Sequence, residues 1–352
     1  MKLQGNITLR RLIAAVMGLP LTWLVTSMPA VAQNAYITNQ GVYPNFSNTV
    51  TVIDTTTDKV VTTVDVGLAP AGVAVTSDGS KVYIANEAVK GTVSVIDTAT
   101  NTVSATIAVG SNPLGVAVKP DGSKVYVTNK GRRGTVSVID TATDSVSTTI
   151  DLGLTPIGVA VAPDGSKVYV ANEAVNGTVS VIDTATNAVS ATVAVGRHPT
   201  GIAIKPDGSR VYVVNRGNGT VSVLDGTNKE VATIDVGLAP FGVAVAPDGR
   251  RVYVTNLNNT VSIIDTATNA VTATISVGKG PLGIAFTPDG SKAYVANELD
   301  HTVSVIAIPS NTVVATIHVG TSPIAFGIFM LPPKITLRLI DLPPPGNRHQ
   351  HR

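Results

Sequence analysis

A tetrapeptide pattern, Tyr-x-x-Asn, recurs seven times and constrains the fold more than any other feature. Its asparagines are Asn39, Asn86, Asn129, Asn172, Asn215, Asn256 and Asn297. Successive copies lie 47, 43, 43, 43, 41 and 41 residues apart. Self-similarity at a fixed period of this length indicates an array of equal supersecondary units.

Each unit contains four β-like runs, as the copy that starts at Gly115 shows. A short apolar run ends in the Pro-Asp-Gly turn at 120–122, and "SKVYVTN" follows at 123–129. A third run ends in an Asp-Thr turn near Asp140, and "SVSTTIDLG" at 145–153 is the fourth. Turn residues separate runs rich in β-branched residues, and no segment has a sustained helical period. The units are therefore all-β, with four strands each.

The ends of the array predict how it closes. The second, third and fourth runs each occur seven times, whereas the first run occurs six times in complete units. The array begins at Ala35 without a first run, and a seventh such run, 323–330, stands alone at its far end. Closing a ring removes exposed sheet edges. We predict a seven-bladed β-propeller over 33–331, with 323–330 completing the blade made by the three N-terminal strands.

Two terminal segments differ from the repeats. Residues 1–32 combine a basic start, an apolar run and Ala30-Val31-Ala32, which predicts a cleavable signal peptide and a periplasmic or extracellular protein without a membrane span after cleavage. Residues 332–352 form a Pro-rich basic tail, expected to hold one extra strand and then disorder.

These segments also account for the chain's positive charge. The net charge is +2, but three bases lie in 1–32 and four bases against one acid lie after 331, so the body is net −4. A generally basic, nucleic-acid-like surface is therefore not indicated. The chain has no cysteine, which excludes disulfides and thiolate metal sites.

The sequence Tyr126-Val127-Thr128-Asn129 resembles the signature of the YVTN β-propeller repeat family. The neighbouring "GVAV" and Pro-Asp-Gly segments fit the same family, and the resemblance covers about residues 35 to 330. It implies a propeller fold and export, as in archaeal surface-layer propellers and exported bacterial propeller proteins. More distantly, the chain is similar to quinoprotein amine dehydrogenase and lactonase propellers. Because one fold serves many functions, no reaction follows from it.

Residues that recur in every unit are interpreted as structural. Each of the seven asparagines is expected at a strand end, where Asn tolerates a left-handed backbone and bonds local groups. The tyrosines are expected to pack between blades. The six Asp-Gly turns each have a base three residues after the aspartate, which predicts exposed local ion pairs.

Enzyme hypotheses gain little from the sequence. The five histidines show no paired metal-ligand spacing, and neither a G-x-S-x-G elbow nor a phosphate-binding loop is present. A lactonase would need convergent acids, His or Arg at a channel mouth, where only Arg197 and His198 qualify. We expect no resident cofactor or metal, and no catalytic residue is assigned.

The residues that break the repeat are the candidates for function. They fall in loops that a propeller places on one face, and aromatic and Arg side chains are the types that anchor interfaces. The candidate binding residues are Tyr43, Phe46, Lys130, Arg132, Arg133, Arg197, His198, Arg216 and Phe241. Acid and base alternate after the asparagines of the middle blades, which predicts ion pairs between blades around the rim. The residues after the loop prolines predict an apolar ring near the channel mouth.

Three functions remain open at this point. The first is a monomeric, non-enzymatic exported scaffold that binds a protein or small ligand on this face. The second is a lactonase-like or quinoprotein-associated enzyme. The third is single-stranded nucleic-acid binding, with the basic loops on the phosphates and with Tyr43 and Phe46 stacking on bases.

Overall fold

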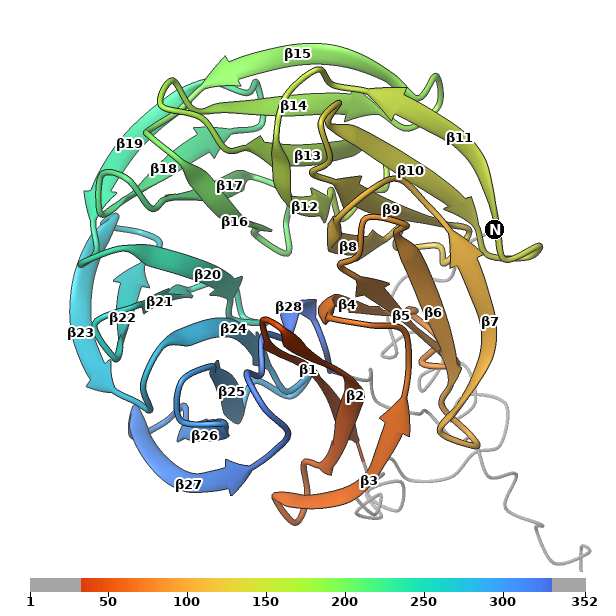
Figure 1. Cartoon of the computed structure of the whole chain (residues 1–352). Coiled ribbons are helices and arrows are strands. Elements are labelled where there is room, and N and C mark those ends of the chain that lie inside the picture. The colour runs from red at the N-terminus through yellow and green to blue at the C-terminus, as the bar shows by residue number, and fades with distance from the viewer. Residues whose placement is uncertain (1–32, 331–352) are drawn as a thin grey trace, which may run out of the picture. The chain divides into compact units, whose positions relative to one another are not determined.

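The computed structural model describes residues 33–330, so the predicted signal peptide and the tail lie outside the described residues. Figure 1 shows the described chain as radial blades around a central axis, on which the channel lies. Each blade is an antiparallel sheet, and consecutive blades follow one another around the ring. Among these residues, no helix could cross a bilayer.

The strands are named by their distance from the channel. The inner strands are β4 (Pro70–Val75), β8 (Pro113–Val118), β12 (Pro156–Val161), β16 (Pro199–Ile204), β20 (Pro240–Val245) and β24 (Pro281–Phe286). The second strands are β1 (Asn34–Val42), β5 (Lys81–Asn86), β9 (Lys124–Asn129), β13 (Lys167–Asn172), β17 (Arg210–Asn215), β21 (Arg251–Asn256) and β25 (Lys292–Asn297). The third strands are β2 (Asn45–Asp54), β6 (Thr92–Asp97), β10 (Thr135–Asp140), β14 (Thr178–Asp183), β18 (Thr220–Asp225), β22 (Thr260–Asp265) and β26 (Thr302–Ala307). The outer strands are β3 (Lys59–Asp65), β7 (Thr102–Ala108), β11 (Ser145–Asp151), β15 (Ala188–Ala194), β19 (Glu230–Asp235), β23 (Ala270–Ser276) and β27 (Thr312–His318). Blade 1 contains β1–β3, and each later blade takes the next four strands.

Burial explains the four strand types. Second and third strands are buried on both faces, so they read as nearly continuous apolar runs such as Val125-Tyr126-Val127. Outer strands have exposed positions that alternate with half-buried or buried ones, as in β11. Sheets buried on both faces favour Val and Ile, whereas a half-solvated strand alternates. The apolar clusters join residues of adjacent sheets, such as Tyr83 of β5 with Val125 of β9, so the core lies between blades.

The C-terminal segment closes the ring, as predicted. Pro323 bridges Asn39, Met330 bridges Ala35, and the Tyr36 N–H donates to the Phe329 carbonyl at 2.9 Å. Its regular part, β28 (Phe326–Ile328), pairs in parallel with β4 rather than extending the blade 1 ladder. The segment thus bonds to β1 of blade 1 and to β4 of blade 2.

An insertion explains this geometry. In blade 3, five positions separate the bridging Pro113 from Val118, which faces Val125. In the closing segment, seven positions separate Pro323 from Met330, which faces the equivalent Ala35. The two additional residues displace the middle of the segment into the channel, where it meets the free inner edge of β4.

Candidate binding face

Two sets of loops share one face, here called the loop face. They run from each outer strand to the next inner strand, and from each second strand to its third strand. The backbone joins the two sets: the Lys130 N–H donates to the Asn112 carbonyl at 3.0 Å, and the Arg216 N–H donates to the His198 carbonyl at 3.1 Å. The opposite face, the turn face, carries the Pro-Asp-Gly and Asp-Thr turns.

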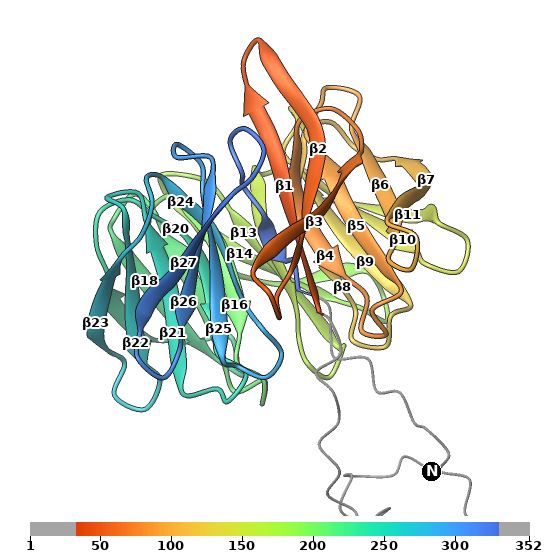
Figure 2. The ribbon, with the colours of Figure 1, turned by 90° about the horizontal axis from the view of Figure 1, so that it is seen from below.

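The strongest departure from the repeat is the hairpin of blade 1. Its second strand does not stop at Asn39 but continues to Val42, and β2 begins at Asn45. The segment around Tyr43, expected to be a loop, is therefore largely a strand extension, which projects beyond the other loops in Figure 2. At its tip, Tyr43 is 80% exposed and Phe46 is 40% exposed. Their rings meet edge to face, with centroids 6.0 Å apart.

The candidate basic residues fall into separate groups. Arg197, His198 and Arg216 lie together on blade 5, where the Gly217 N–H donates to the Arg197 carbonyl at 3.0 Å. Arg132 and Arg133 are exposed on blade 3, so the loop of blade 4 lies between the two groups. The aromatic pair belongs to blade 1. The candidate binding residues named here thus form three groups on three blades.

Two candidate residues are engaged within the protein. Lys130 Nζ lies 2.5 Å from Glu87 Oε1, which forms one of the rim ion pairs expected between blades. Gln40 Nε2 also donates to Glu87, at 2.7 Å. Phe241 is half-buried and meets Phe326 edge to face, with ring centroids 5.5 Å apart.

His198 occupies a position set by backbone geometry. Its φ is +50°, and the equivalent loop residues Ala69, Asn112, Ala239 and Ser322 share this left-handed conformation. The conformation directs the carbonyl toward the neighbouring loop. Because unrelated side chains share it, the strain at His198 belongs to the loop and gives no indication of catalysis.

An apolar cluster closes the channel at the loop face. It contains Ala71, Leu114, Ile157, Leu282, Ile324 and Phe326, each at most 7% exposed. The apolar ring expected after the loop prolines therefore exists, but it is packed rather than open. Phe326, which sequence reasoning missed as a channel residue, comes from the closing segment.

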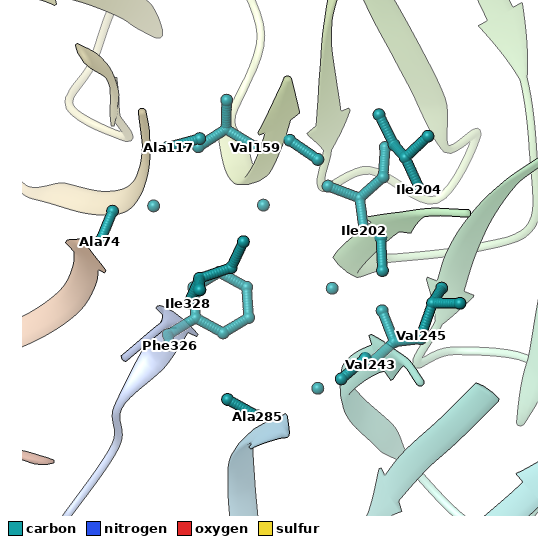
Figure 3. Close-up of a pocket in the computed structure, with 18 of the residues that line it drawn as sticks. Ala74, Ala117, Val159, Ile202, Ile204, Val243, Val245, Ala285, Phe326 and Ile328 are labelled. Atoms are coloured by element: carbon teal, nitrogen blue, oxygen red, sulfur yellow. The ribbon is translucent and has the colours of Figure 1, made fainter. Parts of the chain in front are cut away.

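A cavity of about 370 Å³ occupies the channel beyond this cluster. Figure 3 shows Phe326 and Ile328 inside a circle of side chains from the inner strands. The cavity reaches the turn face, since Pro163 and Pro247 of the Pro-Asp-Gly turns line it. Its lining consists of Gly, Ala, Val, Ile, Pro and Phe, so no lining side chain can transfer a proton or attack a carbonyl.

The seven recurrent asparagines are at most 1% exposed. Asn129 shows the common arrangement: its Nδ2 donates to Thr135 Oγ1 at 3.1 Å and to Ser137 Oγ at 2.9 Å. A Cβ added to Gly110 of the preceding blade would lie 2.6 Å from Asn129 Cγ. Contrary to expectation, these asparagines have extended backbones and bond third-strand hydroxyls. Left-handed conformation belongs instead to Asx residues of the Asp-Thr turns, such as Asn101 and Asp144.

Five of the seven recurrent tyrosines bond to the Asp-Thr turn of the next blade. Tyr83 Oη donates to Asp144 Oδ1 of the next blade at 2.9 Å, and Lys81 Nζ lies 2.8 Å from Asp144 Oδ2. Tyr294 and Lys292 of blade 7 both bond Asp58 of blade 1. The bases of the repeat were expected to pair locally with the Asp-Gly turns. Lys81 and Lys292 instead reach across the blade boundary, because the next Asp-Thr turn packs over the start of their strand.

Burial perturbs several titratable groups. It raises the pKa of Tyr36 and of Tyr126 to about 12, and it raises the pKa of Glu298 on the loop face. The Ser209 hydroxyl and N–H, followed by Lys205, lower the pKa of Asp207 to about 2. Within residues 33–330, no group of three or more His, Cys, Asp or Glu side chains converges as a metal site would require.

Comparison with known proteins agrees with the fold. Residues 159–322 match the family described as Lactonase, 7-bladed beta-propeller. Comparison with curated proteins finds no match. The structure resembles hydrazine synthase of Kuenenia stuttgartiensis at 24% identity with a TM-score of 0.68, covering 81% of this chain and 97% of that one.

Two further solved structures are similar at lower identity. A functionally unknown protein from Desulfotomaculum acetoxidans shares 17% identity with a TM-score of 0.71, covering 84% of this chain and 100% of that one. A putative 6-phosphogluconolactonase from Bacteroides fragilis shares 18% identity with a TM-score of 0.71, covering 85% and 99%. These likenesses establish the fold alone: the described chain is an all-β, seven-bladed propeller of four-stranded blades.

Proposed function

We propose that the chain is an exported, non-enzymatic binding scaffold of the YVTN-repeat type that engages its ligand through the loop face. The observation that carries this proposal is the blade 1 hairpin, which holds Tyr43 and Phe46 in solvent. Two aromatic side chains exposed side by side lack the stabilising free energy that each would gain from burial in a core. Such residues characteristically anchor interfaces. The motif and the leader-like residues 1–32 support the repeat family and export.

The hairpin provides a direct test of the scaffold proposal. The full chain and its Tyr43→Ser/Phe46→Ser variant are used to capture molecules from the exported fraction of the producing cell. Val61→Ser/Val314→Ser is the matched control, because it removes two exposed apolar side chains from outer strands. We expect mass spectrometry to find a ligand that the wild type and control retain and the hairpin variant loses. Retention by all three proteins would contradict the proposal.

A second candidate function is lactone hydrolysis, which the family match over 159–322 favours. Arg197 and His198 would be the groups for this chemistry, at the loop face rather than in the apolar cavity. Assays with 6-phosphogluconolactone and unphosphorylated lactones test it. Turnover that His198→Ala abolishes and Tyr43→Ser leaves intact would favour this candidate over the scaffold.

A further inference from the structure

The two faces of the ring differ in their exposed apolar side chains. Nine of the large apolar side chains exposed within residues 33–330 lie on the loop face: Val42, Tyr43, Phe46, Leu68, Val89, Leu154, Val175, Leu238 and Leu299. The others lie on outer strands, except Ile328 of the closing segment. The Pro-Asp-Gly and Asp-Thr turns carry none. Isolated exposed apolar residues are normal, but their presence in the loops of one face and absence from the turns of the other requires an explanation.

These side chains are distributed around the ring instead of gathering in one cluster. Apart from the hairpin, six loops contribute one each, among them Val89 on blade 2, Val175 on blade 4 and Leu299 on blade 7, and the other loops contribute none. A protein partner usually concentrates its binding energy in a compact central cluster. A circle of separate apolar loop residues instead matches a broad, laterally uniform apolar phase.

The exposed charges of these loops are basic. Lys90, Arg132, Arg133, Arg197, Arg216 and Lys279 are all exposed, whereas the acids of the same loops, Glu87, Glu173, Glu298 and Asp300, are only partly exposed. Three exposed aspartates, Asp65, Asp151 and Asp235, lie farther out, at the ends of outer strands. On the turn face, the aspartates of all six Asp-Gly turns are exposed. An anionic surface would therefore be approached by the loop face first.

The hairpin has the dimensions of an interfacial anchor. The extension of β1 from Asn39 to Val42 adds three residues, or roughly 10 Å at about 3.3 Å per residue. Interfacial elements bury their apolar side about 5–10 Å into the boundary between headgroups and acyl chains. No charged residue occurs from Gln40 to Asn48, and Tyr is a residue type enriched at that boundary. Figure 2 shows the hairpin as the part of the ring that projects farthest on this side.

We propose that the loop face docks on an anionic lipid surface, with the Tyr43/Phe46 hairpin inserted and the basic loops on the headgroups. This inference rests on the proposed function, since it names the ligand of the same face. Apolar insertion and attraction to anionic headgroups act together, so neither the hairpin nor the basic loops alone gives full affinity. The leucines and valines of the other loops rest at the headgroup boundary.

Vesicle co-flotation tests the inference. The full chain is mixed with phosphatidylcholine vesicles that contain or lack phosphatidylglycerol, so any contribution of residues 1–32 is common to all variants. We expect binding to the anionic vesicles that weakens about tenfold or more in Tyr43→Ser/Phe46→Ser and not in Val61→Ser/Val314→Ser. Arg132→Gln/Arg133→Gln should weaken that binding about tenfold, and added salt should also weaken it. The turn-face control Lys59→Gln/Arg250→Gln should have no effect.

Two results would overturn the inference. One is wild-type protein that does not float with anionic vesicles, and the other is flotation that the hairpin variant retains in full. If vesicle binding fails while a protein is still captured through the hairpin, the lipid inference is wrong and the scaffold proposal stands. If neither vesicles nor any captured molecule depends on the hairpin, both proposals are wrong. Circular dichroism of each variant confirms that the fold is intact.

Discussion

Single hydroxyl groups decide how firmly neighbouring blades are joined. Tyr83 Oη donates to a carboxylate that Lys81 also binds, whereas the buried Tyr126 Oη has no partner in the described structure. A hydrogen bond to a charged group contributes about 1.5–3 kcal/mol, and partial exposure of Asp144 reduces this. We expect Tyr83→Phe to lower the free energy of unfolding by about 1 kcal/mol, measured by chemical denaturation. Tyr126→Phe should change it by less than about 0.5 kcal/mol; equal losses in both variants would contradict this account.

The recurrent asparagine gives a second prediction at this scale. Asn129→Ala removes the donor that Thr135 and Ser137 share and leaves space beside Gly110. We expect a loss of about 1–3 kcal/mol in the free energy of unfolding, because the buried Ser137 hydroxyl and the half-buried Thr135 hydroxyl lose a partner. The exposed Asn45 is the control, and Asn45→Ala should be nearly neutral. If both substitutions cost the same, the buried network would not be the cause.

Sequence reasoning at the residue scale located the ends of the second strands but not the contacts made there. The spacing of Asn129 and its equivalents marked each strand end, yet the left-handed backbone belongs to residues such as Asn101. Both are Asn at a fixed offset in the repeat, so composition cannot distinguish them. The hydrogen-bonding register, which places Asn129 opposite Thr135, decides the matter. Likewise, the ion pair between Lys81 and Asp144 depends on how neighbouring blades pack, and no local sequence pattern predicts it.

Among the elements, the closing segment was predicted best and still differs in detail. Counting strand types was sufficient to predict that 323–330 returns to the first blade. The parallel pairing of Phe326 with Gly72 depends on the two additional residues of the segment. No sequence periodicity specifies the side to which they displace it. The hairpin of blade 1 shows the same limit: its aromatic residues were visible in the sequence, whereas the continuation of β1 to Val42 required the register of Gly41 with Phe46.

The closing segment also carries a stability prediction. Phe329 is 0% exposed and packs in the cluster that joins blade 7 to blade 1. We expect Phe329→Ala to lower the free energy of unfolding by about 3–5 kcal/mol, because it opens a cavity where the ring closes. Ile328 is 70% exposed, so Ile328→Ala should cost less than about 1 kcal/mol. Thermal denaturation of the two variants checks this contrast, which would be absent if the segment did not close the ring.

The whole molecule repeats one turn chemistry, so small local effects accumulate. The pKa of Asp121 is lowered by Lys119 first and Ser123 next, and that of Asp207 by Ser209 first and Lys205 after it. Backbone N–H groups first and Thr hydroxyls next lower the pKa of Asp183 and of Asp265. Each such carboxylate is bonded more strongly when ionised. The raised pKa of Glu298 acts in the opposite sense, because its burial favours the protonated form. The turn aspartates with a lowered pKa outnumber this one glutamate.

These shifts predict the acid stability of the ring. An aspartate whose pKa is lower in the folded than in the unfolded state contributes stability that is complete above the unfolded value of about 3.9. That contribution is lost as the pH falls toward the folded value, which is about 2 for Asp207. We therefore expect a constant free energy of unfolding from pH 7 to about 5 and a steep loss between about pH 4 and 2. Urea titrations monitored by far-UV circular dichroism at each pH measure this profile.

The substitution Asp207→Asn should make this loss slightly shallower. Asp248→Asn is the matched control, because Arg250 replaces the serine there and only its N–H, at 2.9 Å, bonds the carboxylate. Stability that instead rose as the pH fell from 4 would mean that buried groups such as Glu298, rather than the turns, govern the titration.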